Sequence, residues 1–191
     1  MTTQNLLRGF TALVAALVCV TAVAIKGSPA HQTPGTGKIF LQQVDGTVTV
    51  NGRPAAKGDE FSSGGSVTTA KGSSAVVSLG KLGRVEVLPE STMKLSFTGS
   101  RITIRMLDAG RVRVSSSSGT AVTATTKDGE TTGDSSVKNE MVIDTRCGNT
   151  TVFVRTGRVD VRDFRLKKTV RTDSKHTIGN GKAGCTPSSQ E

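Results

Sequence analysis

The chain has 191 residues, and its 25 Lys and Arg against 15 Asp and Glu give it a formal net charge of +10. It has no Trp or Tyr and only six scattered Phe residues, so it lacks the stacking platform that single-stranded nucleic acids require. The composition therefore argues against a nucleic-acid partner. The basic excess instead indicates attraction to anionic polymers or lipid head groups.

The first 25 residues are typical of an export signal. Residues 10–25 are uncharged and mostly apolar, and they follow a short head whose only charged side chain is Arg8. The run is shorter than the roughly 20 residues that span a bilayer comfortably. It predicts one apolar helix, which is either a signal peptide cleaved after Ala24 or Ala30, or a retained anchor with its positive head inside. Cys19 is expected to be one more apolar residue of this run.

Residues 26–43 are expected to form a linker, residues 44–180 one β domain, and residues 181–191 a polar tail. Apolar residues alternate with polar ones in short runs from position 44 onward, and glycines separate the runs. A stretch rich in Ser, Thr and Gly, residues 115–136, interrupts them. The alternating positions are Val44, Val48, Val50, Ala75, Val77, Leu79, Val85, Val87, Met93, Leu95, Phe97, Ile102, Ile104, Met106, Val112, Val114, Val142, Val152, Val154, Val159, Val161 and Val170.

This pattern predicts an all-β domain, because alternation with period two is the signature of strands and no window shows a helical stripe. Short strands at intervals of about 8 to 12 residues favour a stacked β-roll or a short β-solenoid, with a β-sandwich as the alternative.

One stretch resembles a catalytic motif. Residues 91–94 spell the Ser-x-x-Lys tetrad of penicillin-binding proteins, in which Ser and Lys meet on one face of a helix. Here Pro89 precedes the tetrad and an alternating strand follows, so Ser91 and Lys94 are expected to point to opposite sides of a sheet. The companion motifs Ser-Asp-Asn and Lys-Thr-Gly are absent from the sequence. We therefore expect no catalysis at Ser91, and no catalytic residue elsewhere.

The cysteines of the exported part, Cys147 and Cys185, are predicted to form a disulfide, because an exported domain lies where disulfides persist and one pair permits one bridge. The alternative, in which one of these cysteines is a nucleophile and His176 is its base, has no supporting motif. A metal site is not expected, because His31 lies in the linker and no close ligand pair exists. No cofactor is expected either.

The order of the pieces resembles the FecR domain. The run "GTVTVNGRPAAKGDEFSSGGSVTTAKGSSAVVSLGKLGRVEVLPESTMKLSF", residues 46–97, matches that family's Gly-led strand, Gly-Asp turn, threonine-rich strand and Pro-x-Ser turn. "LDAGRVRV", residues 107–114, and "TTVFVRTGRVDVR", residues 150–162, look like its two Gly-x-Val-x-Val segments. The chain departs from the family in having "DTRCGNTTVFV", with a cysteine, where a Gly-Thr-x-Phe-like segment is usual. The resemblance covers residues 44–180 and implies that Ser91 is a turn residue serving nearby backbone groups.

Family regulators combine a cytoplasmic anti-sigma segment, one membrane helix and a periplasmic part that ends in a receptor-facing domain. Nine residues before the apolar run are too few to grip a sigma factor, since specific interfaces bury about 800 Å² per partner. The sequence therefore predicts an exported, non-enzymatic FecR-like domain that binds a protein or an anionic polysaccharide of the cell envelope. The alternatives are an accessory role in envelope-to-cytoplasm signalling and a self-associating structural β protein. The expected location is the periplasm or cell envelope, with anchoring in the inner membrane if the apolar segment is retained.

Overall fold

The computed structural model describes residues 39–187. The predicted apolar helix of residues 1–25, its cleavage positions and His31 lie outside the described residues. The chain divides into two units, Met1–Gln32 and Thr33–Glu191, and everything described below belongs to the second unit. Within residues 39–187 the regular structure is β, apart from one 3-10 turn, η1 (Gly80–Leu82). The all-β prediction is confirmed, and no helix in this range has both the length and the hydropathy to span a membrane.

The strands form a seven-stranded sheet and a nine-stranded sheet. In spatial order, the seven-stranded sheet contains β1 (Phe40–Asp45), β5 (Ser74–Ser78), β6 (Gly83–Val87), β9 (Arg111–Ser116), β12 (Asn139–Asp144), β13 (Thr150–Thr156) and β16 (Lys175–Ile178). The nine-stranded sheet contains β3 (Arg53–Pro54), β2 (Val48–Val50), β4 (Gly65–Thr69), β7 (Ser91–Thr98), β8 (Arg101–Met106), β10 (Ala121–Thr125), β11 (Gly129–Gly133), β14 (Val159–Asp163) and β15 (Lys168–Thr172).

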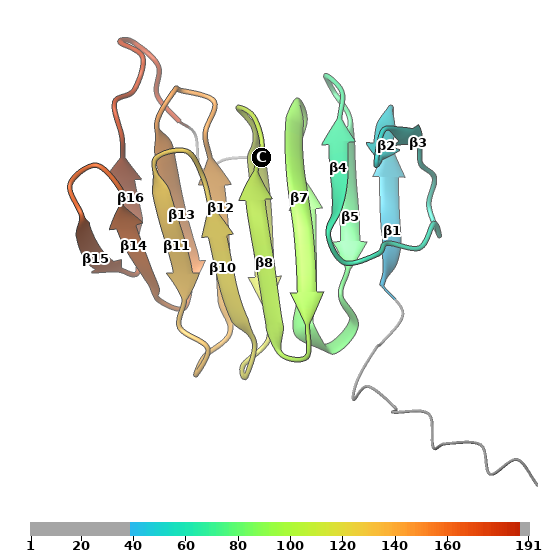
Figure 1. Cartoon of the computed structure of the whole chain (residues 1–191), viewed down its shortest axis with the longest axis horizontal. Helices are drawn as coiled ribbons and strands as arrows, with labels where there is room; N and C mark the ends of the chain where they lie inside the picture. The colour runs from blue at the N-terminus through green and yellow to red at the C-terminus, as the bar shows by residue number, and fades with distance from the viewer. Residues whose placement is uncertain (1–38, 188–191) are drawn as a thin grey trace, which may run out of the picture. The chain divides into compact units, whose positions relative to one another are not determined.

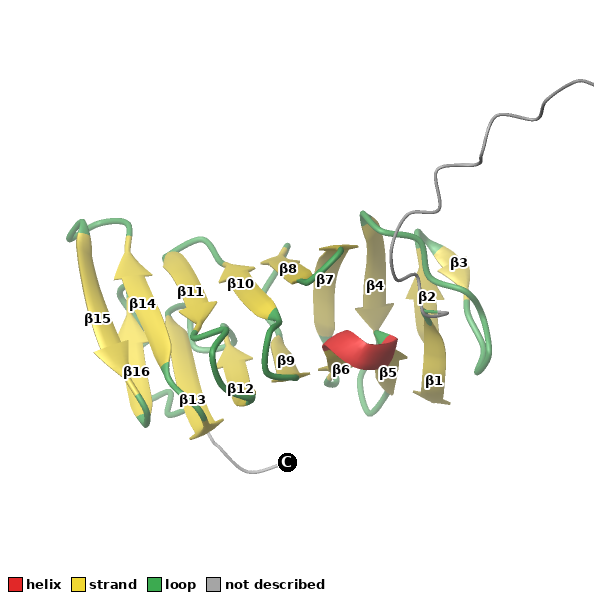
Figure 2. Cartoon of the chain, turned by 90° about the horizontal axis from the view of Figure 1, so that it is seen from below, coloured by secondary structure: helices red, strands yellow, loops and turns green. Residues whose placement is uncertain are grey.

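The spatial order of the strands follows the order of the chain in both sheets. The seven-stranded sheet runs from β1 to β16 without inversion, and the nine-stranded sheet is inverted only at its end, where β3 lies outside β2. The colours in Figure 1 accordingly advance from blue to red across the strands, and Figure 2 shows the two layers from below. Only β8 and β10 pair in parallel among the described strands, because β9 joins the other sheet between them.

One hydrophobic core lies between the two sheets, since strands of both contribute to a single buried cluster. Valines dominate on the seven-stranded sheet, where Val85, Val87, Val112 and Val114 are fully buried. Longer side chains face them from the nine-stranded sheet, including Met93, Leu95, Ile102 and Ile104. The alternation of the sequence thus becomes a packed layer of aliphatic side chains that removes apolar surface from water.

Residues 115–136 do not interrupt the strands, although the sequence pattern suggests an interruption. They contain two strands that the alternation of apolar residues did not reveal. β10 turns Val122 and Ala124 into the core, while β11 places Gly129, Thr131 and Gly133 at its buried positions. The inward residues of β11 carry too little apolar surface to produce a visible hydrophobic period. Gly129 has no room for a side chain, since a Cβ there would lie 2.1 Å from the carbonyl oxygen of Arg162.

Two other details differ from the prediction. Val142 does not begin the core-facing alternation of β12: Met141 and Ile143 lie in the core cluster, and Val142 is buried on the other face of the strand. Three consecutive apolar residues leave the phase of a strand undetermined, and the pairing with β9 decides it. The β domain also starts earlier than residue 44, because β1 begins at Phe40 and pairs with β5.

Most loops lie at the two ends of the strands and form two rims. Residues 70–73, 88–90, 107–110, 126–128, 145–149 and 164–167 lie at one rim together with residues 179–187, as the strand registers require. We call this end, the upper one in Figure 1, the disulfide rim. Residues 99–100, 117–120, 134–138 and 157–158 form the opposite rim.

Candidate functional site

Ser91 and Lys94 point to opposite faces of β7, as the strand interpretation predicts. Ser91 begins the strand and is 1% exposed, whereas Lys94 is exposed on the outer face of the nine-stranded sheet. The two side chains that would have to cooperate in a Ser-x-x-Lys enzyme are therefore separated by the sheet itself.

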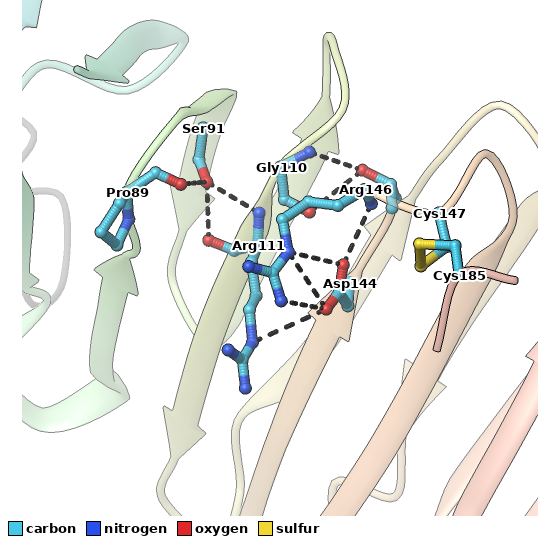
Figure 3. A network of polar contacts seen from close by, with 9 residues as sticks. Pro89, Ser91, Gly110, Arg111, Asp144, Arg146, Cys147 and Cys185 are labelled. Atoms are coloured by element: carbon cyan, nitrogen blue, oxygen red, sulfur yellow. Dashed lines mark hydrogen bonds and ion pairs between the residues drawn. A yellow bond between two sulfur atoms is a disulfide. The ribbon is translucent and has the colours of Figure 1, made fainter. Parts of the chain in front are cut away.

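The hydroxyl of Ser91 joins the two sheets at the disulfide rim. Its Oγ accepts a hydrogen bond from the backbone N–H of Arg111, at 2.7 Å, and lies within donating distance of the carbonyl oxygens of Arg111, at 3.0 Å, and Pro89, at 3.1 Å. Ser91 belongs to the nine-stranded sheet and Arg111 to the seven-stranded one, so this single side chain links the layers (Figure 3). The turn-residue role that the sequence predicts for Ser91 agrees with these contacts.

Gly110 is required for this junction. A Cβ at position 110 would lie 2.8 Å from the Cα of Ser91, closer than real Cβ contacts. The backbone of Gly110 also meets Thr145, whose N–H donates to the Gly110 carbonyl at 2.8 Å and whose Oγ1 accepts from the Gly110 N–H at 2.9 Å. The Gly of "LDAGRVRV" thus allows three segments, residues 88–91, 107–111 and 145, to meet at one point.

A buried acid lies beside the junction. Asp144 ends β12 with its side chain fully buried, and its Oδ2 lies 3.8 Å from Nε of the equally buried Arg111. Arg146 donates to the same carboxylate from Nη2, at 2.7 Å, and from its backbone N–H, at 3.0 Å. These contacts satisfy the desolvated carboxylate and fix the direction in which the loop after β12 leaves the sheet (Figure 3).

The disulfide follows immediately. The structure joins Cys147 to Cys185, with the two Cα atoms 5.5 Å apart, as the sequence predicted for this pair. Next to the bond, the N–H of Lys182 donates to the carbonyl of Cys147 at 2.7 Å. The bridge therefore holds the tail after β16 against the loop that connects β12 to β13. With both sulfurs in this bond, neither cysteine has a thiol to act as a nucleophile.

A pocket of about 350 Å³ opens on the disulfide rim. Met106, Leu107 and Ala109 supply apolar walls, and the cationic side chains come from Lys127, Arg146 and Lys182. Asp108, Thr145 and Gly148 complete the lining. Four separate segments form the pocket: the β8–β9 loop, the β10–β11 loop, the β12–β13 loop and the tail held by the disulfide.

The basic side chains are positioned by contacts with the loops. Lys127 donates from Nζ to the carbonyl of Gly148, at 2.8 Å, and to Oδ1 of Asp128, at 2.6 Å. Lys182 packs over Gly148, where a Cβ would lie 3.3 Å from the Lys182 Cγ. Lys127 and Arg146 are each also paired with a carboxylate, Asp128 and Asp144. Together with Lys182 they place positive charge beside an apolar wall, which suits a ligand with an acidic group next to an apolar one. Asp108 is the single acid of the lining and biases the site against a ligand carrying acidic groups on every side.

The carboxyl groups with displaced pKa values lie outside this pocket. Hydrogen bonds from the hydroxyl and backbone of Ser136 lower the pKa of Asp134, and the guanidinium of Arg171 lowers that of Asp160. The pKa of Asp163 is lowered chiefly by the backbone N–H of Leu166. A local turn or ion pair therefore explains the lowered pKa of each of these three carboxyl groups.

The remaining candidates from the sequence are His176 and the metal-ligating side chains. His176 lies on β16 opposite Val152, in a strand pair of ordinary register. Within residues 39–187 no group of three or more His, Cys, Asp and Glu side chains is arranged to hold a metal ion.

Neither protein-family models nor curated proteins give a match to the chain. Any function of the chain is therefore inferred from the geometry of the disulfide rim. Sequence reasoning identified Ser91, Cys147 and Cys185 but not Lys127, Arg146 or Lys182. The only signal in the sequence was the general basic excess, because the four segments that form the pocket are far apart in the chain.

Proposed function

We propose that the chain is an exported, non-enzymatic binding domain that resembles the FecR domain and recognises a protein or polysaccharide of the cell envelope. The observation that carries this proposal is the pocket of the disulfide rim, where Lys127, Arg146 and Lys182 surround an apolar wall. Such a site matches an acidic group of an envelope component, and the basic excess of the chain would raise the rate of encounter with it.

Two further features support the proposal. The strands of both sheets follow the order of the chain, which favours a stacked β-roll over a Greek-key sandwich. The Pro-x-Ser turn and the first Gly-x-Val-x-Val segment, which carry that resemblance, meet at the Ser91 junction. The Cys147–Cys185 bond is compatible with an oxidising compartment outside the cytoplasm.

Site-directed photo-cross-linking in cells that export the protein tests this function. A photoreactive residue replaces Ala109, in the wall of the pocket, and a matched one replaces Ser118 on the opposite rim. We expect a specific adduct from position 109 only. Its yield should fall at least tenfold with Lys127→Gln and Lys182→Gln together, and should be unchanged with Lys57→Gln and Lys81→Gln, which remove the same charge elsewhere.

The identity of the adduct separates the alternatives. An envelope protein or polysaccharide supports the proposed function, and a membrane-bound regulator that contacts a sigma-factor system would favour the signalling role. A second copy of the chain would favour the structural role. Equal labelling from both positions would exclude the pocket as the binding site.

A further inference from the structure

The large exposed hydrophobic side chains of residues 39–187 gather at one end of the strands. They are Leu107, Phe164 and Leu166, which are 46%, 44% and 60% exposed. Leu107 follows β8, and the other two occupy the turn between β14 and β15, so all three lie on the disulfide rim. Single exposed hydrophobic residues are ordinary, but three at one rim and none at the other among the described residues indicate a surface that meets an apolar phase.

The β14–β15 turn presents its hydrophobic residues on a fixed backbone. Oδ1 of Asp163 accepts from the backbone N–H groups of Arg165, at 2.8 Å, and Leu166, at 2.9 Å. The N–H of Phe164 donates to the carbonyl of Asp128 at 3.0 Å, which ties the turn to the neighbouring loop. Because these bonds order the backbone in advance, burial of Phe164 and Leu166 would cost little additional conformational entropy.

Basic residues are adjacent to the two hydrophobic residues in the chain. Arg165 and Lys167 lie in the same turn, Lys168 begins β15, and all three are exposed. Lys127 lies in the adjacent β10–β11 loop. The one acid of the turn, Asp163, is directed into the backbone hydrogen bonds just described. The turn therefore offers positive charge around an apolar tip.

We propose that the β14–β15 turn docks the domain on the surface of an anionic phospholipid bilayer, with Phe164 and Leu166 inserted at the interface and Arg165, Lys167 and Lys168 among the head groups. Insertion of aromatic and aliphatic side chains, combined with attraction of basic ones to anionic lipid, is how peripheral proteins bind membranes. This inference goes beyond the proposed function, because it uses residues outside the pocket and requires no protein or polysaccharide ligand.

A bilayer fits this surface better than a protein partner does. Specific protein interfaces bury about 800 Å² per partner around a well-packed centre. The turn instead presents two hydrophobic side chains with cations beside them, and a fluid interface can accept this arrangement without a complementary pocket. The cations also oppose self-association through the same turn, since like charges would meet.

A single tryptophan provides a local probe, because the natural chain contains none. The full chain carrying Phe164→Trp is mixed with vesicles of phosphatidylglycerol and phosphatidylethanolamine, and separately with vesicles of phosphatidylcholine. We expect a blue shift of tryptophan emission, and quenching by brominated lipid, with the anionic vesicles only, reversed by high salt. Leu166→Trp is the second probe in case the first variant folds poorly. The readout reports the turn itself, so association of vesicles with any other part of the chain does not produce it.

Charge variants supply the matched control. In the Phe164→Trp background, Arg165→Gln, Lys167→Gln and Lys168→Gln together should weaken vesicle binding at the turn at least tenfold. Lys57→Gln, Lys81→Gln and Lys138→Gln together remove the same charge away from the disulfide rim and should leave vesicle binding unchanged.

Position provides the second control, because a tryptophan probe at Ser118, on the opposite rim, should remain in water throughout. The proposal is overturned if the tryptophans of the Phe164→Trp and Leu166→Trp variants both stay in water with anionic vesicles, as they would if the turn bound a protein instead. Equal shifts with neutral vesicles would also overturn it.

Discussion

At the scale of single residues, the most informative side chain is Ser91. Its hydroxyl joins the two sheets at this point of the rim through hydrogen bonds with the backbone of Arg111. The letters of a Ser-x-x-Lys tetrad therefore belong to a structural hydrogen bond. Gly110 explains why the junction is so close, since any side chain there would collide with Ser91.

Replacement of Ser91 by Ala should destabilise the domain. It leaves the buried N–H of Arg111 without its acceptor, so the free energy of unfolding should fall by about 1–3 kcal/mol. Denaturant titration measures this loss. Ser96→Ala, on the outward face of the same strand, is the matched control and should change stability by much less.

The same hydroxyl should be chemically inert. Because Ser91 is buried and hydrogen-bonded, a β-lactam should form no covalent adduct with the wild-type protein, as judged by intact mass. Labelling at Ser91 would contradict the assignment of this residue as structural.

At the scale of elements, the β14–β15 hairpin shows how one carboxylate shapes a turn. Asp163 ends β14 and accepts from two N–H groups of the turn that follows. These bonds favour the ionised form, so the pKa of Asp163 lies below its ordinary value. The stabilising effect of this carboxylate is accordingly present above the pKa of the unfolded chain, about 3.9.

The pH dependence of stability tests this cap. The wild type should melt above Asp163→Asn at neutral pH, because the ionised acceptor is the stronger one. The difference should shrink as pH falls from about 4 through the lower pKa of the folded state, where the carboxyl gains a proton. Thermal melts between neutral and strongly acidic pH measure it. Asp173→Asn, an exposed change in the next turn, should show no comparable trend, and a constant difference between wild type and Asp163→Asn would contradict the assignment.

At the scale of the described unit, the two sheets and the disulfide stabilise different parts of the chain. The sheets are held by the core and by strand pairing from β1 to β16. The tail after β16 is polar and exposed, and it is fastened by the disulfide and the hydrogen bond from Lys182 to Cys147. Because that tail supplies one wall of the pocket, the redox state of the bridge and the shape of the site are linked.

Loss of the disulfide should loosen the tail and lower stability. The bridge spans a sequence separation of 38 residues, for which chain entropy gives about 4 kcal/mol, so Cys185→Ser should lower the melting temperature by about 10 °C. Calorimetry measures the shift, and limited proteolysis should remove the tail from the variant first. Ala183→Ser, in the same exposed segment, is the control. Free thiols on both cysteines in protein recovered from its native compartment would contradict the bridge.

Alternating apolar residues and the order of glycines were enough to predict an all-β unit and the opposite directions of Ser91 and Lys94. The number of cysteines after the N-terminal apolar run left Cys185 as the single possible partner of Cys147. These features depend on the period-two alternation of side chains along a strand and on the number of cysteines, and both can be read from the sequence without knowing which strands pair. The phase of β12 and the strands hidden in residues 115–136 depended on pairing with neighbours. Val142 shows this, because its partner strand, rather than its hydrophobicity, determines the face on which it lies.

Only the tertiary structure decided which basic side chains lie together on the disulfide rim. Lys127, Arg146 and Lys182 belong to three segments, and the sequence contains no signal that their loops share a rim with the exposed Phe164 and Leu166. The physical reason is that strand registers fix which loops become neighbours, and register is set by core packing between distant strands. The sequence by itself determined the class of the fold and its bridge, while the packing of two sheets created the pocket and the basic, apolar rim.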